Sequence, residues 1–145
     1  MYKRILITLE NSATDVAVLT HIRPLLKLTG AAVTLTHVAD GFVARNQEQL
    51  NLQDSEEMCD DRECLERVRL ELASEGFNVE AVLLQGEPAE KIVELANSIG
   101  CDLIAMSTHG HKFFGDLVLG SVANKVRHLT DIPVLLVPAR KRDRA

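Results

Sequence analysis

The residues with the clearest chemical potential lie between Met106 and His128, where two glycines are separated by nine residues. Gly110 follows Ser-Thr-His, and Gly120 is followed directly by Ser121. Glycine lets backbone N–H groups approach a ligand without a Cβ in the way. A helix beginning at Ser121 would add unpaired N–H donors and partial positive charge, which suit phosphate. The pattern therefore indicates an anion cradle for a nucleotide, although two ordinary loop glycines and a capping serine would look the same.

Other chemistries have less support in the sequence. Neither a GxxxxGK-S/T loop nor a GxGxxG loop occurs. His109 and His111 would need a third convergent ligand to hold a metal, with His37 as a candidate at a neighbouring strand end. We interpret them as loop histidines near phosphate, and we expect no metal site. No nucleophile with a paired base is evident, so no catalytic residue is predicted.

Strands and helices alternate along the chain. The apolar runs are near-continuous in Val, Ile, Leu and Ala, which is typical of a parallel sheet covered on both faces. We therefore expect an α/β fold, an open five-stranded parallel sheet with helices on both faces. The expected strands are Arg4–Leu9, Ala31–Val38, Asn78–Gly86, Cys101–Met106 and Pro133–Pro138. Ligands of such sheets bind at the carboxyl ends of the strands, which is where the glycine stretch falls.

The expected helices have recognisable ends. Ser12 with Asp15 resembles a capping box before a helix over 13–28, and Gly30 is a suitable end for it. An apolar stripe of Leu65, Val68 and Leu72 marks a second helix. Two further helices are expected over 87–100 and 121–129.

Composition limits the class of protein. The 145 residues suggest one domain over 1–139 with a basic tail over 140–145. A formal net charge of −5 argues against nucleic acid as a partner, and no apolar stretch is long enough for a membrane span. Three cysteines without a CxxC pair indicate neither a disulfide framework nor a zinc site, and favour a reducing cytoplasm.

Over residues 2–138 the chain resembles a single-domain universal stress protein. Nucleotide-binding members carry Gly-x2-Gly-x9-Gly-Ser/Thr after the fourth strand, and this sequence has Ser107-x2-Gly110-x9-Gly120-Ser121. The stretches ILITLENS, GEPAEKIVELA and GSVANKVRHLTDIPVLLVP are also typical of the family. The resemblance is weakest between residues 42 and 75. It implies a Rossmann-like fold of the adenine nucleotide alpha hydrolase type.

The resemblance also implies which residues form an ATP site. The adenosine would contact Thr8 and Glu10, and the adenine base would contact the main chain of Val38. The ribose and phosphate side would be lined by Met106, Ser107, His109 and Gly110, and the phosphate groups would contact Gly120, Ser121 and Val122. Two positions depart from the family: Ser107 replaces a glycine, and Glu10 replaces the usual aspartate.

The function implied by the resemblance is that of a cytoplasmic stress-response regulator or protective factor rather than an enzyme. Its ligand would be ATP, alone or together with Mg²⁺, or another adenine nucleotide. A homodimer would form through the last strand, at Val134, Leu135, Leu136 and Val137. Two alternatives stay open: a dimeric interaction module that binds no nucleotide, and a slow nucleotide hydrolase.

Overall fold

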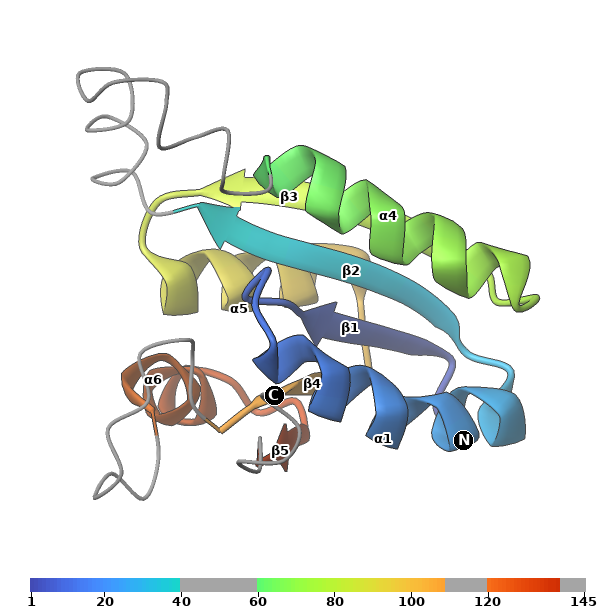
Figure 1. Cartoon of the computed structure of the whole chain (residues 1–145). Helices are drawn as coiled ribbons and strands as arrows, with labels where there is room; N and C mark the ends of the chain where they lie inside the picture. Colours follow the sequence, from blue (N-terminus) through green and yellow to red (C-terminus); the bar gives the residue numbers. More distant parts are fainter. Residues whose placement is uncertain (40–59, 109–119, 139–145) are drawn as a thin grey trace.

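The computed structural model describes residues 1–39, 60–108 and 120–138 (Figure 1). The described residues form a sheet of five parallel strands with the order β3-β2-β1-β4-β5. The strands are β1 (Arg4–Thr8), β2 (Ala32–Ala39), β3 (Val79–Gln85), β4 (Leu103–Ser107) and β5 (Val134–Val137). The predicted fold class is confirmed, and the five expected strands are found within two residues of their expected bounds.

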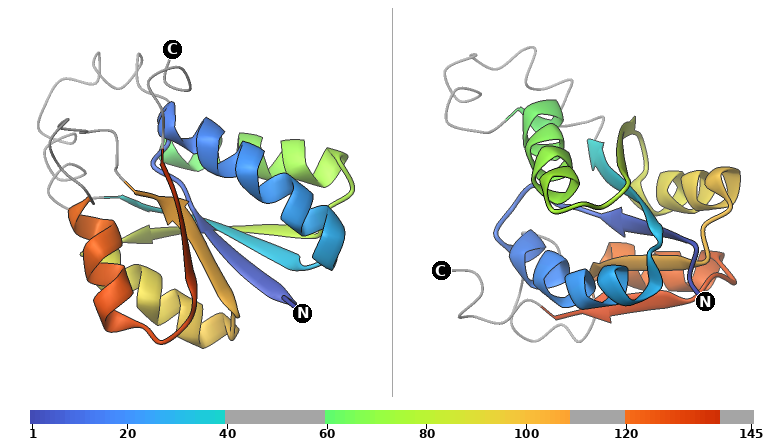
Figure 2. Two further views of the ribbon diagram at one scale, coloured as in Figure 1. Left: turned by 90° about the horizontal axis from the view of Figure 1, so that it is seen from below. Right: turned by 90° about the vertical axis from the view of Figure 1, so that its right-hand side faces the viewer.

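The helices cover both faces of this sheet, as Figure 2 shows from two directions. They are α1 (Thr14–Thr29), α4 (Asp61–Ser74), α5 (Pro88–Ile99) and α6 (Ser121–Leu129). Helices α1 and α4 pack on one face, and α5 and α6 pack on the other. Because β1 is central, Ile5 and Ile7 contribute to the first apolar cluster and Leu6 to the second. No helix of the described residues is both long enough and apolar enough to cross a bilayer.

Local sequence explains where the helices begin and end. Gly30 and Gly100 close α1 and α5 with φ of 68° and 65°, a left-handed conformation that glycine adopts without strain. Pro88 lies in the first turn of α5, where a missing N–H is harmless, and the Glu87 side chain caps the helix by accepting from the Glu90 N–H. The helix over 121–129 has the predicted bounds.

The amino end of β1 is held by a partly exposed carboxylate. Asp102, just before β4, accepts the N–H groups of Lys3 at 2.8 Å and Arg4 at 3.2 Å. Partial burial raises the pKa of Asp102, but these two N–H groups outweigh burial and hold the pKa below its usual range. Asp102 therefore ties β1 to β4 in its ionised form.

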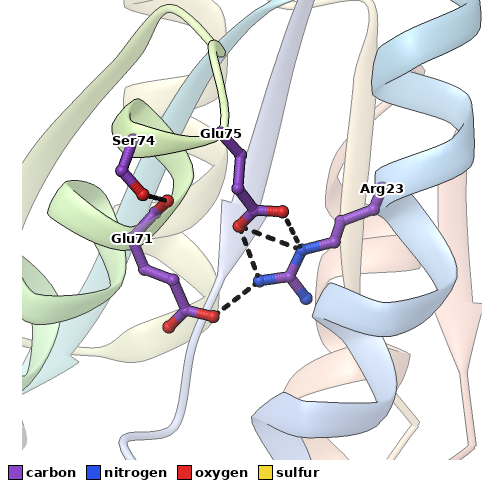
Figure 3. A network of polar contacts seen from close by, with 4 residues as sticks. All are labelled: Arg23, Glu71, Ser74 and Glu75. Carbon is purple, nitrogen blue, oxygen red and sulfur yellow. Dashed lines mark hydrogen bonds and ion pairs between the residues drawn. The ribbon is translucent and has the colours of Figure 1, made fainter.

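Helices α1 and α4 are also joined across the first face of the sheet (Figure 3). The Arg23 guanidinium donates from Nε to Glu75 at 3.0 Å and from Nη2 to Glu71 at 2.8 Å. Side chains of Arg23, Glu71 and Glu75 are 23%, 57% and 34% exposed. Solvent screens such an ion-pair cluster, so it aligns the two helices more than it stabilises them.

The cysteines correct one prediction. Cys101 is free and buried in the core. Cys64 in α4 takes part in a disulfide, which the odd cysteine count and the absence of a CxxC pair did not predict. The cysteine argument for a reducing compartment therefore loses its support, and localisation stays a prediction.

Candidate functional site

The candidate site lies at the carboxyl edge of the sheet, between β1 and β4. The chain proceeds from β1 to β2 and β3 on one side, then crosses to β4 and β5 on the other. The segment after β1 leads to α1 on one face, and the segment after β4 leads to α6 on the opposite face. The two segments diverge here, so this is the switch point at which open α/β sheets bind ligands.

The two flanks of the glycine stretch meet at this edge. The Gly120 N–H donates to the Thr108 carbonyl at 2.6 Å, and the Thr108 N–H donates to the Val137 carbonyl at 3.1 Å. Residues 109–119 lie outside the described residues. The hydrogen bond between Thr108 and Gly120 nevertheless places the end of β4 next to the start of α6.

Helix α6 begins as an anion site would require. Gly120 is extended, with φ of −65° and ψ of 154°, and its carbonyl accepts the Asn124 N–H at 3.0 Å. As a glycine it brings no side chain to cap the helix. The N–H groups of the first turn of a helix have no partner within it, and they carry partial positive charge. Ser121 is exposed beside them.

A largely buried apolar cluster adjoins this helix start. Val38 from β2 and Val122 from α6 are partly buried, and both pack against the cluster that contains Met106 of β4. Met106 is 2% exposed. The sequence-predicted residues Val38, Met106 and Val122 thus share one apolar cluster, although they come from three separate elements.

The segment after β1 supplies the polar side of the edge. Thr8 is buried at the end of β1, and Glu10 is partly exposed two residues later. Asn11 has a φ of 55°, in the left-handed region that asparagine tolerates better than most residues. This single residue turns the chain from β1 toward α1.

Asp15, in the first turn of α1, holds this turn through its carboxylate. The sequence predicted Asp15 as part of a capping box but not as part of the site. The Glu10 N–H donates to Asp15 Oδ1 at 2.8 Å, and the Ser12 N–H donates to Asp15 Oδ2 at 3.3 Å. The second contact is the reciprocal half of the predicted capping box. The first half differs, because Ser12 Oγ accepts from the Thr14 N–H at 3.4 Å instead of from Asp15.

Burial raises the pKa of the Asp15 carboxyl from 3.8 to about 6. The N–H groups of Glu10 and Ser12 act in the opposite direction, and the nearby Glu10 charge adds to the rise. Asp15 is only 8% exposed. The carboxylate is therefore kept ionised at neutral pH in a place that disfavours its charge.

A second set of contacts holds the same turn from the side of β2 and α4. His37 Nδ1 lies 2.8 Å from the Leu9 carbonyl, so this nitrogen carries the hydrogen that it donates. His37 Nε2 lies 3.4 Å from Asp61 Oδ1 at the start of α4. The Asn11 amide donates to the same Asp61 oxygen at 3.1 Å. His37 is therefore engaged in this network.

Several predictions concern residues that the structure places differently or does not describe. Ser107 is the last residue of β4, one residue beyond the predicted strand end, and is 7% exposed. His109, Gly110 and His111 lie outside the described residues. Within the described ranges, no group of three His, Cys, Asp or Glu side chains could hold a metal ion.

The described residues form a doubly wound α/β protein with a candidate site at the switch point of its sheet. The model of the universal stress protein family matches residues 1–138, and the chain belongs to this family. It is similar to the universal stress protein MJ0577 of Methanocaldococcus jannaschii, with 29% identity over 154 residues, covering 94% of this chain and 95% of the relative. The solved structure of MJ0577 has a TM-score of 0.81 and 32% identity, and the match covers 97% of this chain and 99% of that one.

Two other solved structures of the family contain nucleotides. A universal stress protein from Archaeoglobus fulgidus in complex with dAMP matches with a TM-score of 0.64 and 23% identity, covering 94% of this chain and 98% of that one. A universal stress protein in complex with cAMP matches with a TM-score of 0.68 and 17% identity, covering 96% and 98%. At these identities the two structures support the shared fold.

Proposed function

We propose that this protein binds an adenine nucleotide at the carboxyl edge of its sheet, with ATP as its ligand, alone or with Mg²⁺. It acts in the cytoplasm as a stress-response regulator or protective factor rather than as a metabolic enzyme. Family membership supports the role in stress response. Relatives of the same fold bind dAMP and cAMP, which supports an adenine nucleotide as the class of ligand.

The observation that carries this proposal is the hydrogen bond of 2.6 Å between the Gly120 N–H and the Thr108 carbonyl. It puts the start of α6 beside the end of β4, where the family resemblance expects phosphate. The N–H groups at the start of α6 would bind phosphate oxygens, and the Ser121 hydroxyl would add a donor. Phosphate is therefore expected on the same side of the sheet as the apolar cluster that contains Met106.

We assign the remaining residues by their places around this point. Thr8 and Glu10 would meet adenosine at the end of β1. The partly buried Val38 would offer main-chain groups to the base, and Val122 would pack near the phosphates. The full proposed set is Thr8, Glu10, Val38, Met106, Ser107, His109, Gly110, Gly120, Ser121 and Val122, of which His109 and Gly110 lie outside the described residues.

The test is to identify small molecules released by denaturing protein that was purified without added nucleotide, using mass spectrometry. We expect a near-stoichiometric adenine nucleotide in the parent protein and none in Gly120→Val. Gly120 has an ordinary φ of −65°, so valine meets no backbone strain there. Gly100→Ala is the matched control, because it strains the backbone at the opposite edge and should keep the nucleotide. An empty parent that also fails to bind added ATP would reject the proposal.

One observation favours an interaction module that binds no nucleotide. Ser107 is 7% exposed and adds a Cβ where nucleotide-binding relatives have glycine. If this Cβ blocks the ligand, Ser107→Gly should bind ATP where the parent does not. A slow nucleotide hydrolase would show ATP turnover that the Gly120→Val substitution abolishes. ATP that stays constant for hours in the presence of the parent protein would reject the hydrolase.

We also propose a homodimer through β5, which is an edge strand of the described sheet. The Pro133 and Val137 carbonyls accept from β4, so the alternating main-chain groups of Leu136 point outward. Leu136→Pro would remove an outward N–H, and Leu136→Ala would trim the side chain but keep it. Sedimentation should show a dimer for the parent and for Leu136→Ala, and a monomer for Leu136→Pro. A monomeric parent would refute the dimer.

A further inference from the structure

The turn between β1 and α1 is held by more contacts than a connecting loop needs. The Leu9 N–H donates to the Thr36 carbonyl at 2.8 Å, and the Leu9 carbonyl accepts from His37. The Glu10 and Ser12 N–H groups both end on the Asp15 carboxylate. The Asp15 contacts alone depend on a buried charge, so the conformation of this turn is linked to the ionisation of one carboxyl.

We infer that Asp15 is a positioning residue for the nucleotide site, whose ionised carboxylate holds the Glu10–Ser12 turn in its binding conformation and whose protonation releases it. This inference rests on the proposed function. Asp15 acts through Glu10 and the main chain, and it need not touch the ligand. An ionised carboxylate accepts at both oxygens, whereas a protonated one keeps one oxygen as a hydroxyl donor. Protonation therefore weakens the hydrogen bond from either the Glu10 or the Ser12 N–H, because a hydroxyl oxygen is a poorer acceptor than a carboxylate oxygen.

An ordinary helix-capping role does not account for Asp15. Acidic residues in a first turn are stabilised by the helix dipole, and capping lowers the pKa of an exposed carboxyl. Asp102 shows this at the other end of β1, where two main-chain N–H groups at nearly the same distances lower its pKa. Burial reverses the direction at Asp15 and brings its pKa to about 6. At neutral pH Asp15 therefore stays ionised at a buried position where an uncharged capping side chain would stabilise the fold more.

Among the described residues, titratable groups from three elements contact this turn. Glu10 belongs to the turn itself, and its charge raises the pKa of Asp15. His37 from β2 and Asp61 from α4 pair with each other on the other side of Asn11. A nucleotide phosphate would add negative charge near the edge. The N–H groups of Glu10 and Ser12 offset part of this negative charge, since both lower the pKa of Asp15.

The test is calorimetric titration of ATP with Mg²⁺ at pH 7.5 and pH 5.0 into the parent, Asp15→Asn and Asp102→Asn. At pH 5.0 roughly one Asp15 in ten stays ionised, so the parent should bind about tenfold more weakly than at pH 7.5. Asp15→Asn should show the weaker affinity at both values. Asp102→Asn, which removes a carboxylate with similar contacts at the other edge, should follow the parent. Protonation of ATP itself is the same for all three proteins.

A second measurement needs no variant. In amide NMR spectra of the nucleotide-free parent, the Glu10 and Ser12 resonances should titrate with a midpoint near pH 6, while those of Lys3 and Arg4 should not. Equal ATP affinity of the parent and Asp15→Asn at both pH values would overturn the positioning role alone. Absence of ATP binding by the parent at pH 7.5 would overturn the proposed function, and the positioning role with it. Glu10 and Ser12 amides that stay constant through pH 6 would also overturn the inference.

Discussion

The two ends of β1 are held by the same chemistry with opposite energetics. At the amino end, Asp102 accepts two main-chain N–H groups at 2.8 and 3.2 Å. At the carboxyl end, Asp15 accepts two at 2.8 and 3.3 Å. The pKa of Asp102 is lowered and that of Asp15 is raised to about 6, with burial as the largest cause of the rise. Geometry alone therefore does not determine what a capping carboxylate contributes.

The fold tolerates an unfavourable charge at the carboxyl edge of the sheet and not at the amino edge. The amino edge carries features that stabilise in their ordinary states, namely a partly exposed carboxylate and a glycine helix end. The carboxyl edge carries a left-handed asparagine and a buried carboxylate. Strained backbone and perturbed pKa values concentrate at functional sites, so the carboxyl edge is the better candidate on physical grounds as well as by family resemblance.

The largest expected effect concerns Asp15 and the free energy of unfolding. A carboxyl with a raised folded-state pKa stabilises the fold below its unfolded pKa of 3.8, and this contribution is lost as the pH rises through about 6. Urea unfolding at pH 4 and pH 7 should show the parent losing roughly 2 kcal/mol relative to Asp15→Asn. Parallel pH profiles of the two proteins would mean that Asp15 is not a buried charge.

Gly100→Ala should have the next largest effect on the free energy of unfolding. It changes the amino edge of the sheet and leaves the carboxyl edge intact. Gly100 has a φ of 65°, and an added Cβ would meet nothing within 4 Å. The substitution therefore costs only backbone strain, about 1–2 kcal/mol. Urea unfolding measures this loss, and ATP titration should give the affinity of the parent. A change in ATP affinity would place the ligand at the wrong edge.

Asp102→Asn should have a smaller effect, with the opposite pH dependence. A carboxyl with a lowered folded-state pKa stabilises the fold above its unfolded pKa, and the contribution is lost as the pH falls through the folded value. At neutral pH the variant should lose about 1 kcal/mol, limited by solvent exposure. Once the pH has fallen below the folded-state pKa, the parent and variant should converge. A gap that widens in acid would contradict the assigned sign.

The smallest effect is expected at the contacts between α1 and α4. Arg23→Met should lower the free energy of unfolding by about 0.5–1 kcal/mol, because exposed ion pairs contribute little. The loss should shrink at high salt, where charges are screened. Thermal unfolding at low and high salt measures both values. A salt-independent loss of several kcal/mol would show that Arg23 is needed for core packing.

The sequence predicted the sheet because its signals are local. The apolar run inside Arg4–Thr8 forms a strand because both faces of the sheet are covered. The Gly120-Ser121 pair predicted the start of α6 at the residue where the helix begins. The end of β4 was missed by one residue. Ser107 extends the strand because it pairs with Val137, a contact that depends on a strand formed 30 residues later.

Long-range contacts explain what could not be predicted at the site. Ser12 and Asp15 resembled a capping box, but whether such a carboxylate is exposed or buried depends on the packing around it. The contacts of Asn11 and His37 with Asp61 join positions separated by 50 and 24 residues. Local patterns locate strand ends, and tertiary packing determines the charge state of the groups gathered there.

The most direct test is to titrate ATP with Mg²⁺ into isotopically labelled protein and map the amide resonances that change. We expect saturable shifts at the carboxyl edge, in Thr8, Glu10, Val38, Ser107, Gly120, Ser121 and Val122. Resonances of Lys3, Arg4 and Asp102 at the amino edge should stay unchanged. Absence of saturable shifts, or shifts centred on the amino edge, would contradict the proposed nucleotide site.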